Sequence, residues 1–237
     1  MNPYEKLMAR KRKWTPVQTT AGICKEGAEE TIFRALALRH MELPVGDFIT
    51  DALEKNVPSA ARALLESNVT DEENHDVALG YIANAYGVDE QAEKEALALQ
   101  KAWISHPDHT ITKAMVAERA IFFVLLPFFR FCGDAGMRTV SADISRDEQI
   151  HVATNSLVCR ELGLDISPSL DKLRKATINW VMQPLGKSDN KYLDKQFWLA
   201  SSDRLMYEGK APELSETKAG RMPAFFEHSN VNLPQYA

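Results

Sequence analysis

Two pairs of metal-ligating residues stand at helical spacing in this sequence. Glu72 and His75 form a Glu-x-x-His pair, and Glu148 and His151 form a second one further along the chain. Residues three positions apart share one face of an α-helix, so each pair can direct a carboxylate and an imidazole at the same point. Four-helix bundles that bind two iron or manganese ions use two such pairs, together with a single carboxylate from each of the two other helices. The sequence therefore predicts a site for two metal ions.

The helix expected over residues 110–131 supplies one of the single carboxylates. Its inward stripe is aromatic and aliphatic except for Glu118. A carboxylate in such surroundings is costly to bury unless it is paired or binds a metal ion. Glu118 is therefore the candidate ligand from this helix.

The first helix offers several carboxylates, namely Glu26, Glu29, Glu30 and Glu42. If the turn to the second helix is centred near Val57, Glu42 lies level with Glu72. Glu30 would lie ~18 Å further along the helix. Glu42 also lies on the apolar stripe, whereas Glu29 and Glu30 are near the helix start, where carboxylates interact favourably with the helix dipole. We therefore favour Glu42 over the other three.

Helical periodicity extends over most of the chain, and no run of useful length alternates as a β-strand would. The patterns predict helices over residues 27–53 with a kink at Pro44, 59–86, 89–104, 110–131, 135–162, 167–182 and 191–206. The helix over residues 89–104 is expected to be an outer crossover helix. The sequence thus predicts an all-α fold, a four-helix bundle with accessory helices. We expect a single domain over residues 1–206 and a mobile tail over residues 207–237.

Composition narrows the classes of function. The 237 residues carry a net charge of −5, which gives no basic face for nucleic acid, and we expect the basic run at residues 10–13 to be a solvated arm. The longest apolar run, residues 120–129, is about half the ~20 residues that a membrane span needs. Three cysteines without CxxC spacing are typical of free thiols in a reducing compartment. We expect a cytoplasmic protein that binds neither nucleic acid nor a membrane.

The residues around the second pair also resemble a known family. Residues 145–151, Ser-Arg-Asp-Glu-Gln-Ile-His, are similar to the second ligand motif of the small, radical-generating beta subunit of class I ribonucleotide reductase. Residues 118–123 are similar to its preceding ligand helix, and the ligands occur in the same order. The resemblance covers residues 14 to about 160. It implies a ferritin-like bundle whose two metal ions are bound by Glu42, Glu72, His75, Glu118, Glu148 and His151.

The resemblance also implies roles outside the ligand set. Asp147 would hold the ligand histidine His75, and Trp14, followed by Pro16 as in the family's Trp-x-Pro, would begin the radical path out of the site. Such a subunit generates the oxidant with which a large alpha subunit converts ribonucleotides, as diphosphates or triphosphates, to deoxyribonucleotides. We expect a homodimer that binds the large subunit through its C-terminal tail, where Tyr236 is a candidate relay residue.

One departure from the family concerns the stored oxidising equivalent. The family's radical tyrosine usually lies four residues after the first ligand histidine, and this position is Leu79. Tyr81 does not simply replace it, because Tyr81 lies about 240° around the helix from His75. Family members without the tyrosine keep the oxidising equivalent on the metal ions, and we expect the same here. The chain is also short for the family.

The donor set indicates which metals to expect. Four carboxylates and two imidazoles neutralise two divalent ions and form a hard, oxygen-rich set, for which we expect iron first, with manganese or a mixed manganese–iron pair as alternatives. Two other classes of protein use related sites. A dimetal oxygenase or oxidase of ferritin-like fold would act on a small apolar substrate and would need an apolar channel beside the site. A ferritin-type iron-oxidation centre normally lacks the second histidine, so His151 disfavours iron storage.

Overall fold

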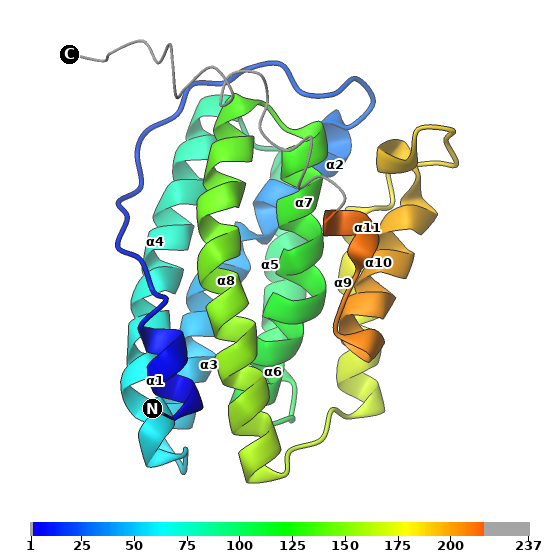
Figure 1. Cartoon of the computed structure of the whole chain (residues 1–237). Coiled ribbons are helices and arrows are strands. Elements are labelled where there is room, and N and C mark those ends of the chain that lie inside the picture. The colour runs from blue at the N-terminus through cyan, green and yellow to red at the C-terminus, as the bar shows by residue number, and fades with distance from the viewer. Residues whose placement is uncertain (1, 216–237) are drawn as a thin grey trace, which may run out of the picture.

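The computed structural model describes residues 2–215, and within this part of the chain there are helices and connecting loops but no β-strand (Figure 1). The predicted all-α fold is therefore confirmed. No helix among these residues is both long enough and apolar enough to cross a lipid bilayer. Residues 216–237, which include Tyr236, lie outside the described residues.

Four long helical stretches form the central bundle, and the first and third are interrupted. The first stretch consists of α2 (Glu29–Ala37), the 3₁₀ turn η1 (Leu38–Met41) and α3 (Glu42–Glu54), and the second, which follows the 3₁₀ turn η2 (Ser59–Ala61), is α4 (Arg62–Tyr86). The third consists of α6 (Thr110–Ala117), the π-helical turn η3 (Glu118–Phe122) and α7 (Phe123–Cys132). The fourth is α8 (Ala135–Leu162). Helix α3 packs on α4, helices α6 and α7 pack on α8, and α4 packs on α8. The apolar side chains of these helices form one continuous core.

Local sequence accounts for where the long helices begin and end. At the start of α8, the Asp134 side chain accepts a hydrogen bond of 2.8 Å from the backbone N–H of Met137. Helix α8 ends at Gly163, which has the left-handed conformation with φ 63°. Helix α4 ends at Gly87, where φ is 101°. These ends fix the length over which the two Glu-x-x-His helices lie against each other.

The kink in the first stretch lies before Pro44 and not at it. Residues Leu38–Met41 form a 3₁₀ turn, and α3 begins at Glu42, so Pro44 lies in the first turn of a new helix. A proline is tolerated there because the N–H groups of a first turn have no acceptor within the helix. The break makes Glu42 the first residue of α3.

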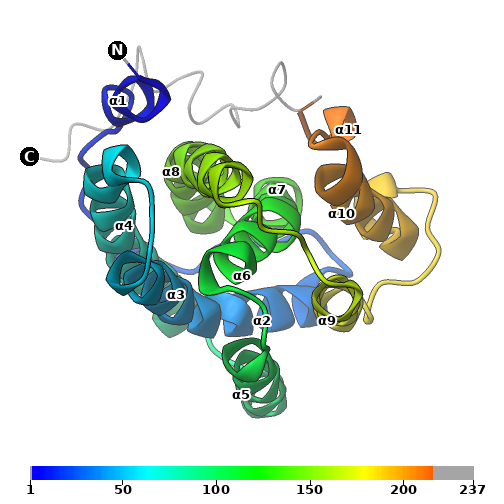
Figure 2. The ribbon, with the colours of Figure 1, turned by 90° about the horizontal axis from the view of Figure 1, so that it is seen from below.

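Accessory elements surround the bundle, and Figure 2 shows their arrangement around its axis. Helix α1 (Pro3–Met8) packs against α4 and α8, and α5 (Glu90–Ser105) lies outside α2. The C-terminal elements lie beside the third stretch of the bundle; they are α9 (Pro168–Val181), η4 (Lys191–Leu193), α10 (Lys195–Glu208) and α11 (Pro212–Ser215). Helix α5 is the outer crossover helix that the sequence predicts. After α1, the chain runs along the outside of the bundle towards its other end (Figure 1).

Packed structure continues beyond residue 206, where the sequence analysis places the start of the tail. Helix α10 ends at Glu208, and α11 follows after a short loop. Ala211 and Leu214 are buried in the apolar core. The segment up to α11 therefore packs with the helices that flank the third stretch of the bundle.

Candidate metal centre

Six buried side chains meet inside the bundle, and they are the six that the sequence analysis selects. None of these residues is more than 3% exposed. Their ligand atoms form two groups, in each of which all atoms lie within 4.8 Å of one another: Glu42, Glu72, His75 and Glu148, and Glu72, Glu118 and His151. Glu72 belongs to both groups, since its Oε2 atom lies 3.6 Å from His75 Nδ1 and its Oε1 atom 2.9 Å from His151 Nδ1.

A π-helical turn presents Glu118 to the cluster. The backbone N–H of Phe123 bonds to the carbonyl of Glu118, five residues earlier, and this widens the helix by one residue. Asn155 Nδ2 donates to Glu118 Oε2 over 2.7 Å and so fixes the carboxylate. Helix α10 supports the turn from outside, where Ser202 Oγ donates to the carbonyl of Ala120 over 2.7 Å. The helical periodicity of the sequence gave no sign of this turn.

The imidazole of His75 connects the cluster to the N-terminal segment. Its Nε2 atom lies 3.3 Å from Asp147 Oδ2, and the same oxygen accepts a hydrogen bond of 2.6 Å from Trp14 Nε1. The Trp14 and His75 rings are stacked, with 6.1 Å between their centroids. On its other edge, His75 Nδ1 lies 3.4 to 3.6 Å from the carboxylates of Glu42, Glu72 and Glu148.

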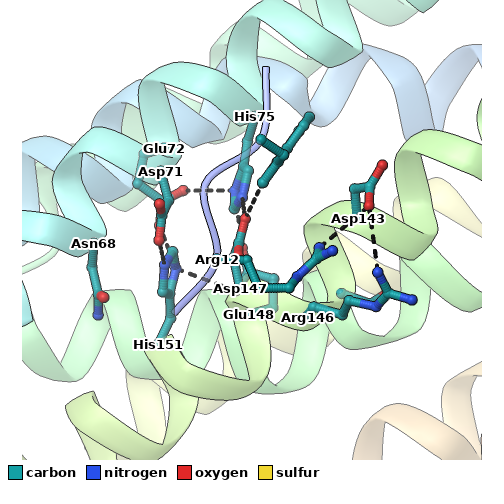
Figure 3. A network of polar contacts seen from close by, with 12 residues as sticks. Arg12, Asn68, Asp71, Glu72, His75, Asp143, Arg146, Asp147, Glu148 and His151 are labelled. Atoms are coloured by element: carbon teal, nitrogen blue, oxygen red, sulfur yellow. Dashed lines mark hydrogen bonds and ion pairs between the residues drawn. The ribbon is translucent and has the colours of Figure 1, made fainter. Parts of the chain in front are cut away.

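The imidazole of His151 has a matching arrangement in the other group (Figure 3). Its Nε2 atom lies 2.8 Å from Asp71 Oδ2, while Nδ1 faces the cluster. The sequence analysis missed Asp71. A signal was available, because an aspartate precedes the glutamate in both Glu-x-x-His motifs. In the fold each aspartate contacts the histidine of the other motif: Asp71 contacts His151, and Asp147 contacts His75.

The atoms that face the centre of the cluster are buried and form no hydrogen bond of good geometry, although the carboxylate oxygens lie 2.9 to 3.9 Å from the two imidazole nitrogens. They are Glu42 Oε2, both oxygens of Glu72, His75 Nδ1, Glu118 Oε1, both oxygens of Glu148 and His151 Nδ1. A buried polar atom without a partner costs about 1–3 kcal/mol, and the atoms on the far sides of both imidazoles do have partners. Carboxylate oxygens and imidazole nitrogens are ligands that iron and manganese accept. The residues therefore fit a pair of such ions.

Burial and crowding change the acidity of the cluster. Desolvation, with neighbouring carboxylates adding to it, raises the pKa of Glu42, Glu118 and Glu148. Burial opposes a charged imidazole, but the Glu72 carboxylate and Asp71 raise the pKa of His151 to about 10. Burial also opposes the charged form of His75, whose pKa the contact with Asp147 raises well above its ordinary value. Metal ions bind the deprotonated groups, so metal binding must release protons.

The N-terminal basic run is not simply a solvated arm. Lys11 Nζ is ion-paired with Asp71 Oδ2, and the Lys11 side chain is only 8% exposed. Arg12 Nη2 lies 3.3 Å from Asp143 Oδ1, whereas Lys13 is exposed. The expectation is therefore wrong for Lys11, because its partner is supplied by α4, which only the tertiary fold brings alongside.

Leu79, which the sequence analysis notes in place of a radical tyrosine, lines a small apolar cavity beside Glu42. The cavity has a volume of about 10 Å³, roughly the space of one water molecule. Its other walls are mainly aliphatic and aromatic, and no tyrosine is among the described residues that line it. Tyr81 is partly exposed. This cavity is therefore too small to hold an organic substrate.

Comparison with known proteins supports the fold. No family model matches the sequence, and no characterised protein sequence matches it significantly. The chain is similar to the crystal structure of a Bacillus halodurans protein provisionally named a class I ribonucleotide reductase. The TM-score is 0.61 at 16% sequence identity, and the match covers 91% of this chain and 97% of that one. At this identity the likeness shows a shared fold.

Glu118→Gln tests two expected effects of the crowded carboxylates: they bind metal ions, and they destabilise the protein when no metal is bound. We expect the variant to lose at least one of about two metal ions per chain, because the amide is a poorer ligand. In the metal-free state it should be more stable than the wild type by about 1 kcal/mol, because one buried acidic group is removed. Elemental analysis and urea denaturation measure the two quantities.

Glu73→Gln is the matched control, because Glu73 adjoins a cluster residue in sequence but is exposed. It should change neither metal content nor stability. Full metal content in Glu118→Gln would show that Glu118 is not a ligand.

Proposed function

We propose that this chain is the small subunit of a class I ribonucleotide reductase. The fold, which it shares with the structure provisionally named for that class, and the buried cluster support the proposal. The two metal ions, iron or manganese, would supply one-electron oxidation with dioxygen or a reduced oxygen species. Their proposed ligands are Glu42, Glu72, His75, Glu118, Glu148 and His151. A large subunit would then reduce a ribonucleoside diphosphate or triphosphate.

One observation carries the proposal, the chain of contacts from His75 through Asp147 to Trp14. His75 is fully buried and Asp147 is 1% exposed, whereas Trp14 is partly exposed. An oxidisable indole therefore lies at the edge of the protein and is joined to the cluster by one aspartate. A buried site cannot touch a substrate on another protein, so an aromatic side chain in this place suits electron transfer between subunits.

Each residue of this route has a defined role. Trp14 gives an electron to the site and is restored by an electron from the partner subunit. Asp147 Oδ2 accepts the indole N–H and can take its proton as the electron leaves. The same oxygen lies against Nε2 of His75, which directs Nδ1 of the imidazole at the cluster.

The apolar wall around Leu79 bears on where the oxidising equivalent is kept. No side chain that lines this cavity gives up an electron readily. We therefore propose that the equivalent stays in the metal site until Trp14 is oxidised. The absence of a tyrosine at this position does not interrupt the route, because Trp14 reaches the cluster through Asp147 on another side.

The competing class, a dimetal oxygenase or oxidase for a small apolar substrate, is less well supported. Such an enzyme needs space for its substrate beside the cluster. The cavity that Glu42 and Leu79 line has a volume of about 10 Å³, and that class of enzyme has no evident use for the contact between Trp14 and Asp147.

Trp14→Phe tests the route directly. The variant should retain about two metal ions per chain and oxidise them at the normal rate, because Trp14 is not a ligand. It should lose nearly all deoxyribonucleotide formation with the large subunit of the same organism, because phenylalanine is much harder to oxidise and has no N–H group. Normal turnover in this variant would eliminate the route.

Trp180→Phe is the matched control for this experiment. The indole of Trp180 also donates to a carboxylate, with 2.7 Å between Nε1 and Glu95 Oε2, but it lies on α9, away from the cluster. Turnover of the Trp180 variant should equal that of the wild type.

We propose that the C-terminal tail binds the large subunit. Its sequence carries apolar side chains suited to a groove on a partner, namely Phe225, Phe226, Leu233 and Tyr236. A chain that ends at Gly220 should keep its metal ions but should neither bind the large subunit nor support turnover. Tyr236→Phe should bind the large subunit normally, and its turnover tells whether Tyr236 relays the radical. Normal turnover of the shortened chain would contradict docking by the tail.

We further propose that the protein is a homodimer. Large apolar side chains remain exposed on the bundle, including Leu43 of α3 at 48% and Val77 of α4 at 43%. Sedimentation at micromolar concentration should therefore give the mass of two chains. A monomer under these conditions would contradict the assignment.

A further inference from the structure

Lys11 is the least expected member of the polar network around the cluster. Its ammonium group is ion-paired with Asp71 Oδ2 and also donates to Asn68 Oδ1 over 2.9 Å. The side chains of Lys11 and Asp71 are 8% and 10% exposed, and Asn68 is fully buried. A buried lysine is rare unless it is paired. The neighbouring basic residue Lys13 is exposed, so burial is particular to Lys11.

The partner of Lys11 is also the partner of a cluster histidine. Asp71 Oδ2 lies 2.8 Å from His151 Nε2, and Figure 3 shows the Asp71 carboxylate against this imidazole, with Asn68 nearby. The series Lys11, Asp71, His151 mirrors the series Trp14, Asp147, His75. One short N-terminal segment therefore contacts both aspartates that hold the cluster histidines.

The positive charge of Lys11 allows the Asp71 carboxylate to remain beside the cluster and to contact His151. Paired with the ammonium group, the carboxylate can accept the Nε2–H of His151 without adding an uncompensated negative charge beside four glutamates. Without Lys11, the largely buried carboxylate would lose the ammonium group that compensates its charge, which is unfavourable. The Asp71 side chain would then turn away, and the His151 ring would lose the contact that fixes its orientation and tautomer.

We propose that Lys11 is a positioning residue for one half of the metal site, the half formed by Glu72, Glu118 and His151. It acts through Asp71, which holds the His151 imidazole with Nδ1 towards the cluster. The N-terminal segment is thus a structural part of the site, and its two anchors serve the two halves separately. This inference rests on the proposed metal site but does not depend on nucleotide reduction.

Lys11→Met tests the inference, because methionine keeps an unbranched side chain of nearly the same length and removes its charge. Anaerobic titration with ferrous ion should show one of the two equivalents bound about 10–100-fold more weakly and the other unchanged. In protein loaded with ⁵⁷Fe, one of two Mössbauer quadrupole doublets should shift or lose intensity. Lys11→Arg, which keeps the charge, should recover most of the affinity, and Lys13→Met should behave as the wild type.

Asp71→Asn shows whether Lys11 acts through Asp71. If it does, adding Lys11→Met to Asp71→Asn should weaken ferrous binding no further, whereas two independent effects would add. Thermal unfolding of the metal-free variants establishes that each is folded. Unchanged affinity in Lys11→Met, equal weakening of both equivalents, or additivity in the double variant would overturn the inference.

These experiments distinguish failure of the role proposed for Lys11 from failure of the function proposed for the protein. A protein with the expected one-sided loss of iron in Lys11→Met but no nucleotide reduction in the wild type would overturn the function and support this inference. Normal nucleotide reduction with unchanged iron binding in Lys11→Met would overturn this inference alone.

Discussion

The crowding of four carboxylates in a dry bundle core is the constraint on which the rest of this structure depends. Like charges so close together are unfavourable, and burial raises the pKa of Glu42, Glu118 and Glu148. The atoms facing the centre form no hydrogen bond of good geometry within the protein, while both imidazoles contact an aspartate on the opposite edge. A bundle optimised for stability alone would fill this space with apolar side chains. The cluster is therefore compatible with a site for metal ions, as we propose.

Backbone irregularities occur where the single carboxylates enter the core. Glu42 follows directly after a 3₁₀ turn, and Glu118 opens a π-helical turn. Both interrupt regular helices, and α10, outside the bundle, supplies a hydrogen bond from Ser202 to the carbonyl of Ala120 in the π turn. The accessory helices thus do more than cover apolar surface. Helix α10 also contacts the backbone of the π turn that presents Glu118.

The outer contacts of the two histidines are the basis of the role that we propose for the N-terminal segment. Asp147 and Asp71 occupy equivalent positions in the two motifs, yet one is paired with an indole and the other with an ammonium group. An indole can be oxidised, whereas an ammonium group can only compensate charge. The two halves of the site therefore differ in their surroundings although their ligand types are alike. We propose that electrons pass on the side of Trp14 and that Lys11 holds His151 in place on the other side.

The sequence by itself determined the parts that depend on local periodicity. Helical spacing places Glu72 with His75 and Glu148 with His151, one acidic residue interrupts the apolar stripe at Glu118, and antiparallel register selects Glu42. The tertiary structure alone decided the parts that depend on packing between distant segments. The ion pair of Lys11 with Asp71 needs the N-terminal segment to lie on α4. The helical pattern of the sequence also does not show the 3₁₀ turn before Pro44 or the π turn at Glu118, where Ser202 of α10 contacts the backbone. A periodic pattern shows which residues share a face, but it cannot show which segment lies against that face.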